Sequence, residues 1–294
     1  MNKRKTVLLV LGALVLLGAV GYVLGLLYQS GPAGLVIALA IAIFMSVGSY
    51  LYGDKVVLAS TRAREVTREQ EPRLHNIVEG IAIAAGLPKP RVYVVPEQAP
   101  NAFATGRNPE HSSIAVTQGL LDMMDRVELE GVIAHELSHV QDRDILVGTI
   151  VATLVGAVIL ISEFFMRTWW WGGLGGRRGE DRGGGASALI FAFGFLLLIL
   201  APIFGQIIRL AVSRQREYLA DAQGAMLTRY PPGLAAALRK IAEAPHAMRS
   251  ANNATAHLWL DQPSRYPGEK MGAMEKLFST HPPIWDRIKR LEEM

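Results

Sequence analysis

The sequence of 294 residues contains no cysteine. Without thiols the chain can form no disulfide bond and offers no thiolate to a metal, so histidine and carboxylate side chains are its available strong ligands. The sequence also lacks a basic stretch interleaved with aromatic residues, which is the usual sign of a nucleic-acid-binding surface. We therefore expect no nucleic-acid partner, and we expect any metal site to be built from histidine, aspartate and glutamate.

Charged residues are almost absent from four long apolar blocks of the chain. Each block approaches or exceeds the roughly 20 residues that cross the hydrocarbon core of a bilayer as a helix. These blocks are residues 6–28, 33–52, 145–165 and 187–212. We interpret them as four transmembrane helices in two hairpins, one within residues 1–52 and one within residues 145–212.

Two other interpretations of these blocks are weaker. A signal peptide would explain the basic start MNKRK, but the first block is longer than the roughly 7 to 15 apolar residues of a signal core. A second apolar block also follows almost at once. A pair of buried helices in a soluble protein would explain the third and fourth blocks, but their length and lack of charge argue against it.

The distribution of lysine and arginine predicts how these helices are oriented. Basic residues precede the first block and follow the second, whereas the turn at 29–32 is uncharged. The positive-inside rule therefore places residues 53–144 in the cytoplasm, and it places the glycine-rich loop 166–186 outside despite its four arginines, because the first hairpin usually dominates. We expect a multi-pass protein of the cell (inner) membrane, whose pI of 9.4 favours contact with the anionic lipids of the bilayer.

The remaining sequence forms two soluble parts, 53–144 and 213–294, which we assign to one cytoplasmic domain. Helical patterns with start and stop signals alternate there with short β-type runs and turn residues. We expect helices at 72–86, 118–124, 126–142, 213–227, 231–244 and after Pro282, and strands at 91–95, 101–106 and 112–117. The predicted fold class is an α+β membrane protein, with four transmembrane helices and a mainly helical domain that contains a small β-sheet.

The chemistry is indicated by HExxH at His135, Glu136 and His139. Residues four apart on a helix share one face, so the two imidazoles can bind one metal ion while the neighbouring Glu136 reaches a water molecule. The metzincin pattern would continue with glycine at 142 and histidine at 145, but Asp142 and Ile145 stand there. Charged residues on both sides of the motif also exclude an intramembrane site, and they place it at the membrane surface.

Zinc in a hydrolytic site needs a third protein ligand, with water in the fourth position. Glu217 and Asp221 lie four residues apart in a predicted helix that follows the fourth apolar block. Glu217 can supply the ligand, and Asp221 can orient a metal-bound histidine. His246 and His257 compete for the third position, but they lie in the polar, irregular segment 245–270, where we expect surface residues.

Several stretches together resemble one protein family. They are NAFATG at 101–106, TQGLL at 117–121, AHELSH at 134–139, SRQREYLAD at 213–221 and THPPIWDRI at 280–288. The chain resembles the HtpX-type membrane zinc metalloproteases, which are akin to the Ste24-type prenyl-protein proteases. The resemblance implies a gluzincin-type domain with one Zn²⁺ on His135, His139 and Glu217, with Glu136 as catalytic base. It also implies quality-control proteolysis of misfolded membrane proteins.

Two further assignments concern the substrate. An extended polypeptide could pair with an exposed edge of the sheet, for which the candidate residues are Asn101, Ala102, Phe103, Ala104, Thr105 and Gly106. The alternative for these residues is an internal structural strand. His281 directly precedes two prolines that fix the backbone, and the resemblance implies that it lies near the metal, where it could donate to the oxyanion of the transition state.

Two rival functions remain at this level. One is a Ste24-like protease that processes lipidated peptides, although four predicted spans fit the HtpX type better. The other is a zinc-binding membrane scaffold or chaperone without catalysis, against which Glu136 argues, because a purely structural site needs no base. The expected partners are membrane-protein or unfolded polypeptide substrates and the lipid bilayer, and the sequence predicts no oligomeric state.

Overall fold

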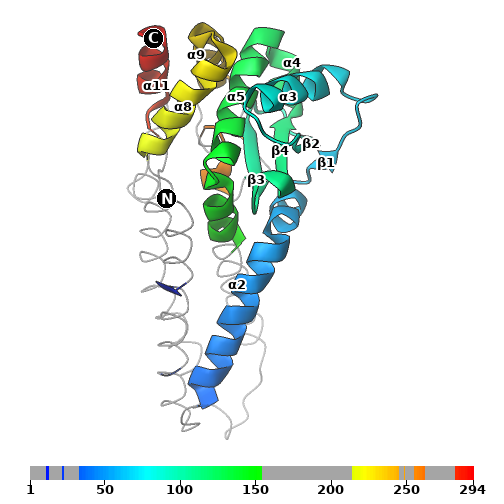
Figure 1. The fold of residues 1–294 in the computed structure, drawn as a ribbon, viewed down its shortest axis with the longest axis vertical. Helices are drawn as coiled ribbons and strands as arrows, with labels where there is room; N and C mark the ends of the chain where they lie inside the picture. The colour runs from blue at the N-terminus through cyan, green and yellow to red at the C-terminus, as the bar shows by residue number, and fades with distance from the viewer. Residues whose placement is uncertain are drawn as a thin grey trace, which may run out of the picture.

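The computed structural model describes residues 11–12, 22, 33–153, 214–244, 248, 255–261 and 282–294 of the chain. In Figure 1 a long helix, α2 (Ala33–Ser60), rises to a wider region where the other described elements are grouped. This region is mainly helical and contains one small sheet. The α+β prediction is thereby confirmed for this part of the chain.

The sheet has four strands in the order β1-β2-β4-β3. The strands are β1 (Arg64–Glu65), β2 (Arg91–Val95), β3 (Ala102–Gly106) and β4 (Ser112–Thr117). β2 and β4 are parallel, whereas β1 pairs with β2 and β3 pairs with β4 in the antiparallel sense. The expected strands are present, and β3 lies at one edge of the sheet. The two-residue β1 was not predicted, because it is too short to show an alternating pattern.

Helix α5 (Arg126–Gln141) is the centre of the region. Its first turn is fixed by a capping box, in which Asp125 accepts from the backbone of Glu128 and the Glu128 side chain accepts from the backbone of Asp125. α5 packs against β3 and against three other helices. These helices are α3 (Pro72–Ala84), α8 (Arg214–Thr228) and α9 (Pro231–Glu243). Two shorter helices, α4 (Gln118–Met123) and α11 (Ile284–Glu292), complete this part.

Two glycines allow the helices to approach α5 closely. A Cβ atom added at Gly224 of α8 would lie 3.0 Å from the backbone nitrogen of His135. A Cβ atom added at Gly131 of α5 would lie 2.7 Å from the backbone nitrogen of Leu234 in α9. Both distances are too short for a larger side chain. The HExxH part of α5 is therefore held by backbone-to-backbone packing as well as by the apolar core.

The segment 255–261 differs from its prediction as a polar surface stretch. It contains a short 3₁₀ helix, η2 (Ala256–Leu258), and the buried side chains of Trp259 and Leu260. The Trp259 ring meets the ring of Phe103 in β3 edge to face, with centroids 4.6 Å apart. Burial of this large aromatic side chain stabilises the packing of the segment on the sheet. The polar residues around it in the sequence gave no sign of this packing.

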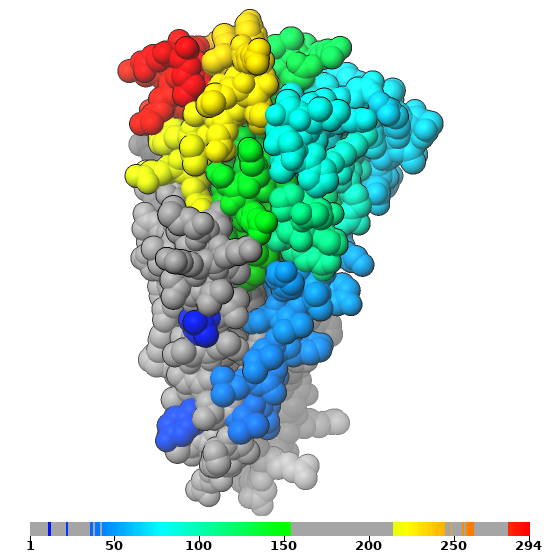
Figure 2. Space-filling model, in the orientation of Figure 1, coloured from blue at the N-terminus to red at the C-terminus, as the bar shows by residue number. Residues whose placement is uncertain are grey.

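Within the part of the chain that the structure describes, one helix is long and apolar enough to cross a membrane, the stretch of α2 from Leu39 to Ser60. Large apolar side chains are exposed along α2, among them Phe44, which is 79% exposed. Figure 2 shows α2 in blue, running from the lower part of the molecule up to the cyan and green elements. The helix continues to Ser60, beyond the predicted boundary at residue 52.

The other predicted spans lie wholly or largely outside the described residues. These are 6–28, 187–212 and most of 145–165, together with the loop 166–186. Of the third block, the structure describes an apolar helix from Asp144 to Thr153.

Candidate metal centre and active site

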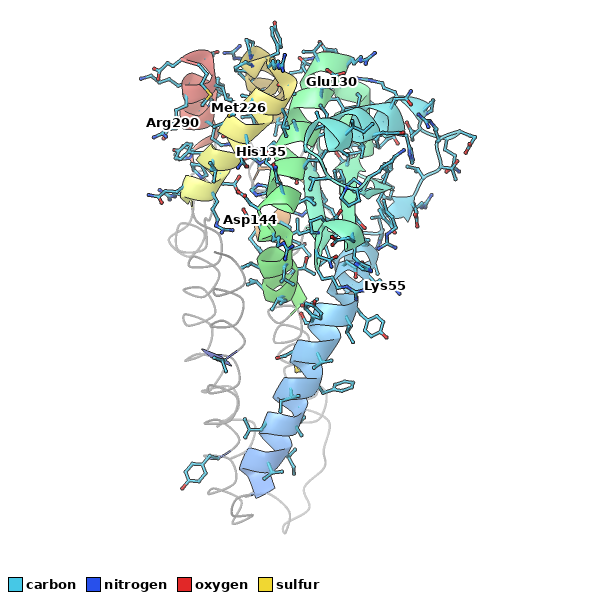
Figure 3. The ribbon with its side chains drawn as sticks, in the orientation of Figure 1. Lys55, Glu130, His135, Asp144, Met226 and Arg290 are labelled. Atoms are coloured by element: carbon cyan, nitrogen blue, oxygen red, sulfur yellow. The ribbon has the colours of Figure 1, made fainter. Side chains whose placement is uncertain are left out.

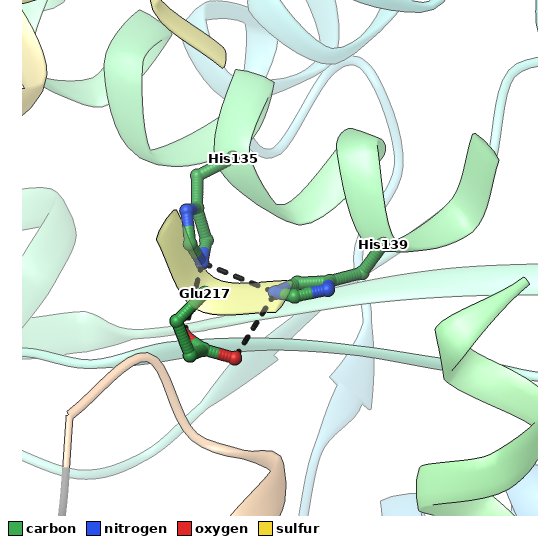
Figure 4. A group of neighbouring side chains, drawn as sticks. All are labelled: His135, His139 and Glu217. Atoms are coloured by element: carbon green, nitrogen blue, oxygen red, sulfur yellow. Dashed lines mark hydrogen bonds and ion pairs between the residues drawn. The ribbon is translucent and has the colours of Figure 1, made fainter. Parts of the chain in front are cut away.

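Helices α5 and α8 bring three predicted metal ligands together. The Nε2 atoms of His135 and His139 are 3.2 Å apart. One carboxylate oxygen of Glu217 lies 3.7 Å from the Nε2 of His135, and the other lies 3.6 Å from the Nε2 of His139. Figure 4 shows the two imidazoles and the carboxylate turned towards one point. In a tetrahedral zinc site with metal–ligand bonds near 2.0 to 2.1 Å, donor atoms are separated by about 3.3 Å. The two nitrogens and the carboxylate are thus close to the spacing that a zinc ion requires.

The imidazole of His135 is held from behind by a buried ion pair. Its Nδ1 lies 2.9 Å from a carboxylate oxygen of Asp221 in α8. That carboxylate accepts two hydrogen bonds from the Arg287 guanidinium of α11, at 2.7 and 2.9 Å, and Arg287 also donates to the backbone oxygen of Leu260. Because Nδ1 carries the proton that is donated to Asp221, Nε2 keeps its lone pair for a metal.

Burial and charge set the ionisation of this group. Burial alone would raise the pKa of Asp221, but the positive charge of Arg287 and the hydrogen bonds from His135 and Arg287 hold that pKa well below its usual range. Burial lowers the pKa of His135 and so favours the neutral imidazole, which is the form that binds metal. These contacts place Asp221 beside His135, and its role behind a metal ligand stays a prediction.

The imidazole of His139 has a partner that the sequence did not suggest. Its Nδ1 lies 3.2 Å from a carboxylate oxygen of Asp144, and the other oxygen of Asp144 forms an ion pair with Arg216 of α8. Figure 3 shows Asp144 below His135, beyond the end of α5. In the sequence, Asp144 is one of a cluster of charges after the motif, and its spacing of five residues from His139 does not match a helical face.

Glu136 is 2% exposed and lines the same cavity as the three ligands. Burial, followed by the nearby carboxylate of Glu217, raises the pKa of Glu136 to about 7, although the charge of His139 and a hydrogen bond from the backbone of Ala104 act in the opposite direction. A carboxylate whose pKa lies near neutrality can both accept and return a proton. Its position therefore suits a general base.

The cavity is small, at about 60 Å³, which is room for a few water molecules. Its lining combines the histidines and carboxylates with Ala104, Gly148, Leu258 and Trp259. Polar and apolar side chains thus share the lining of a space that can hold a few water molecules. The segment 255–261 forms part of that lining.

The proposed substrate strand lies beside the cavity, but most of its edge is occupied. Its residues from Asn101 to Gly106 are buried. The backbone oxygen of Ala102 accepts from Leu260, and the backbone nitrogen of Gly106 donates to the Thr149 hydroxyl. Phe103 and Thr105 are fully buried and face the interior. The residue of this strand that lines the cavity is Ala104.

The side chain of Asn101 has a structural task in addition. Its amide nitrogen donates to the backbone oxygen of Asp261 at 2.8 Å, and its side-chain oxygen accepts from the backbone of Asp261 and of Ala102. These bonds tie the segment 255–261 to the start of β3. If Asn101 contributes to substrate binding, it therefore does so indirectly, by holding segment 255–261 in place.

The structure describes one of the two histidines that compete with Glu217 for the third ligand position. His246 and also His281, the proposed oxyanion donor, lie outside the described residues. The expectation that His257 is a surface residue is wrong, because it is 7% exposed, lines the cavity and donates to the backbone oxygen of Gly148 at 3.1 Å. His257 is nevertheless not part of the group formed by His135, His139 and Glu217.

Comparison with known proteins gives a consistent result. Residues 68–294 match Peptidase family M48. The chain is 47% identical over 293 residues to "Protease HtpX homolog" of Caldanaerobacter subterraneus subsp. tengcongensis, with 100% of this chain and 95% of that protein covered. It is 46% identical over 281 residues to the protein of the same name from Pyrococcus furiosus, with 95% and 91% covered.

One solved structure has a similar fold. The crystal structure of S. mikatae Ste24p matches 99% of this chain with a TM-score of 0.52, at 16% sequence identity. The chain spans 65% of the length of that protein. The two proteins therefore share an arrangement of elements.

Proposed function

The chain belongs to peptidase family M48 and is therefore a protease, and on that premise we propose that it is a membrane-anchored, zinc-dependent endopeptidase. Its substrates are misfolded or damaged membrane proteins and other unfolded polypeptides. The observation that carries the proposal is the convergence of His135, His139 and Glu217 beside the buried carboxylate of Glu136. A scaffold that used a metal only for stability would not need that carboxylate in the same cavity.

The proposed metal is one Zn²⁺ ion per chain, which His135 Nε2, His139 Nε2 and the carboxylate of Glu217 would hold. The spacing of these donor atoms supports zinc, and so does their mixture of two nitrogens and one carboxylate, which is found in catalytic zinc sites. When bound, such an ion lowers the pKa of a coordinated water molecule to about 7 and polarises the carbonyl group of the substrate.

The side chains of the cavity then supply the remaining functions. The carboxylate of Glu136 accepts a proton from the attacking water and delivers it to the nitrogen of the leaving amine. The backbone hydrogen bond from Ala104 orients this carboxylate. His281 is the proposed donor to the oxyanion, and the backbone of Ala104 is the proposed point at which an extended substrate pairs with β3.

The bilayer anchors this site close to its substrates. We propose four transmembrane helices, with the domain formed by 53–144 and 213–294 in the cytoplasm and contacts between its basic residues and anionic lipids. The apolar, exposed surface of α2 supports the membrane anchor. A site tethered in this way meets polypeptides that are themselves bound to the membrane.

The test compares the purified full-length protein with its Glu136→Gln variant on an unfolded membrane protein, in the presence of zinc. We expect Glu136→Gln to lose roughly 100- to 10,000-fold in cleavage rate while it retains zinc, because the side chain moves protons and binds no metal. Glu130→Gln is the matched control, since Glu130 lies on the same helix but forms a surface ion pair with Arg126. The control should retain both zinc and activity.

Two outcomes would contradict the proposal. Undiminished cleavage by Glu136→Gln would remove the assigned base, and loss of zinc from this variant, measured by elemental analysis, would show that Glu136 is needed to hold the metal. A lipidated peptide is included as a second substrate. Cleavage confined to that peptide would favour the processing function over quality control.

A further inference from the structure

Beside His139 lies an ion pair between Asp144 and Arg216 that has no role in the proposed reaction. The Nδ1 atom of His139 lies 3.2 Å from one oxygen of Asp144, and the guanidinium of Arg216 donates to the other oxygen. These side chains are only 14 to 16% exposed. The three residues come from α5, from the start of the following helix and from α8.

A similar arrangement exists behind the other histidine. There the Nδ1 atom of His135 is paired with Asp221, and both oxygens of Asp221 are fixed by Arg287. In each case a carboxylate holds Nδ1 of the imidazole, and an arginine holds the carboxylate. The two Nε2 atoms consequently point towards the same place, 3.2 Å apart.

We propose that Asp144, held in place by Arg216, is a positioning residue that orients His139 towards the metal. The inference rests on the proposed function, since His139 needs a fixed orientation only if it binds a metal ion. An imidazole that donates its Nδ1–H to a carboxylate keeps the lone pair on Nε2 and becomes a stronger ligand. Asp144 therefore selects the tautomer of His139 as well as the direction of its ring.

Arg216 contributes to this orientation because the carboxylate of Asp144, which is partly exposed, could otherwise rotate. With one oxygen on His139 and the other on Arg216, the carboxylate of Asp144 has a single orientation. Arg216 also directly precedes Glu217 in α8. One turn of α8 thus supplies both the proposed third ligand, Glu217, and Arg216, which holds the carboxylate of Asp144.

A purely structural role for Asp144 makes a different prediction. Asp144 is the first residue of the helix Asp144–Thr153, and an acidic residue at a helix N-terminus is stabilising without any metal. That role would change the thermal stability of the zinc-free protein and leave the affinity for zinc unaltered. Metal affinity and the stability gained from zinc therefore separate the two roles.

The experiment uses full-length protein in detergent and the variants Asp144→Ala, Asp144→Asn and Arg216→Gln. Zinc affinity is measured by competition with a chromogenic chelator, and thermal unfolding is followed with and without zinc. The absorption spectrum of the Co²⁺-loaded protein reports the geometry around the metal. Glu130→Ala is the matched control, because it removes a carboxylate from α5 that forms a surface ion pair with Arg126.

We expect Asp144→Ala to weaken zinc binding by roughly 10- to 100-fold and to change the Co²⁺ spectrum. Asp144→Asn should recover part of the affinity, because its amide oxygen can still accept from His139. The increase in melting temperature on addition of zinc should shrink in Asp144→Ala, since this increase depends on the affinity for the metal. In the double variant, Arg216→Gln should add little to Asp144→Ala, because Arg216 acts through Asp144.

Wild-type zinc affinity in Asp144→Ala, with a lower melting temperature in both the zinc-free and the zinc-loaded protein, would overturn the positioning role. An equal loss of affinity in Glu130→Ala would also overturn it, because the effect would then be one of general charge. The proposed function is checked separately with His139→Ala. If that variant kept full zinc affinity, His139 would not be a ligand, and the proposed metal centre itself would be wrong.

Discussion

Glu217 and Asp221 are both carboxylates on one face of α8, but the structure gives them different tasks. Glu217 faces both Nε2 atoms, whereas Asp221 lies between the Nδ1 atom of His135 and the guanidinium of Arg287. Under the proposed function, Glu217 is a metal ligand, and Asp221 supports the ligand His135. Substitutions at the two positions should therefore affect zinc binding to different extents.

We expect Glu217→Ala to lose most of its zinc, since two histidines alone leave the metal with an incomplete set of ligands. Asp221→Asn should weaken zinc binding less, by roughly 10- to 100-fold. It should also lower the free energy of unfolding by roughly 3 kcal/mol, because the buried Arg287 loses its charged partner. Elemental analysis and denaturant unfolding measure the two effects.

An opposite result would be informative about the third ligand. Full zinc in Glu217→Ala would reassign that position, with His246 or His257 as the remaining candidates. If Asp221→Asn retained zinc but was less stable, Asp221 would contribute to the stability of the core and not to zinc binding.

At the scale of single residues, the sequence predicted what a helical repeat can reveal. His135 and His139, and likewise Glu217 and Asp221, are four residues apart on helices, so their side chains were expected to point the same way. Asp144 lies beyond the end of α5, and it reaches His139 through a turn in which Arg143 adopts a positive φ of 60°. A turn of this kind has no signature in a run of charged residues.

Arg287 was missed for a different reason. It shares a helix face with Ile288 and Leu291, which are buried as expected. An arginine on an apolar face is usually assumed to extend into solvent, because a buried charge is costly without a partner. The partner, Asp221, lies on another helix, so the pairing depends on the tertiary structure.

At the scale of elements, the distance between α5 and α8 decides whether a metal fits. Gly224 of α8 faces the backbone of His135, where an added Cβ atom would be 3.0 Å from the nitrogen of His135 and 3.3 Å from the carbonyl carbon of Ala134. Both neighbours are backbone atoms of a helix and cannot rotate away. A larger residue at this position must therefore push the two helices apart.

We expect Gly224→Ala to destabilise the protein by roughly 1 to 3 kcal/mol and to weaken zinc binding, because Glu217 moves away from the two histidines. The control is Gly80→Ala in α3, where an added Cβ atom meets nothing within 4 Å. This control should be more stable by about 0.5 to 1 kcal/mol, since alanine is the better helix former. Urea unfolding and zinc titration of both variants test the prediction. Unaltered zinc affinity in a destabilised Gly224→Ala would separate helix packing from the metal site.

The expected elements and the observed ones differ most around residues 255–261. The strands and helices that carry the site were predictable from periodicity, with ends that differ by a residue or two. Segment 255–261 was not, because its place beside the cavity depends on contacts of Trp259 and Asn101 with residues distant in the sequence. Such contacts leave no periodic pattern in the chain.

At the scale of the whole molecule, the orientation in the membrane determines which polypeptides reach the site. The charge asymmetry around the first two apolar blocks predicts that the proposed metal centre lies on the cytoplasmic side. The absence of cysteine makes this testable with little background, since a single introduced thiol is the only one in the chain. Glu110 is an exposed residue of the soluble region, and Glu180 lies in the predicted outer loop.

We expect a membrane-impermeant thiol reagent to label Glu180→Cys but not Glu110→Cys in intact cells. After the cells are permeabilised, both variants should be labelled, which controls for the reactivity of each thiol. The physical reason is that basic residues near the ends of transmembrane helices stay on the cytoplasmic side, so residues 53–144 remain there. Labelling of Glu110→Cys in intact cells would show that the orientation is the reverse of the predicted one. The proposed protease would then act on segments of membrane proteins that lie outside the cytoplasm, and the substrates chosen for the cleavage assay would have to change accordingly.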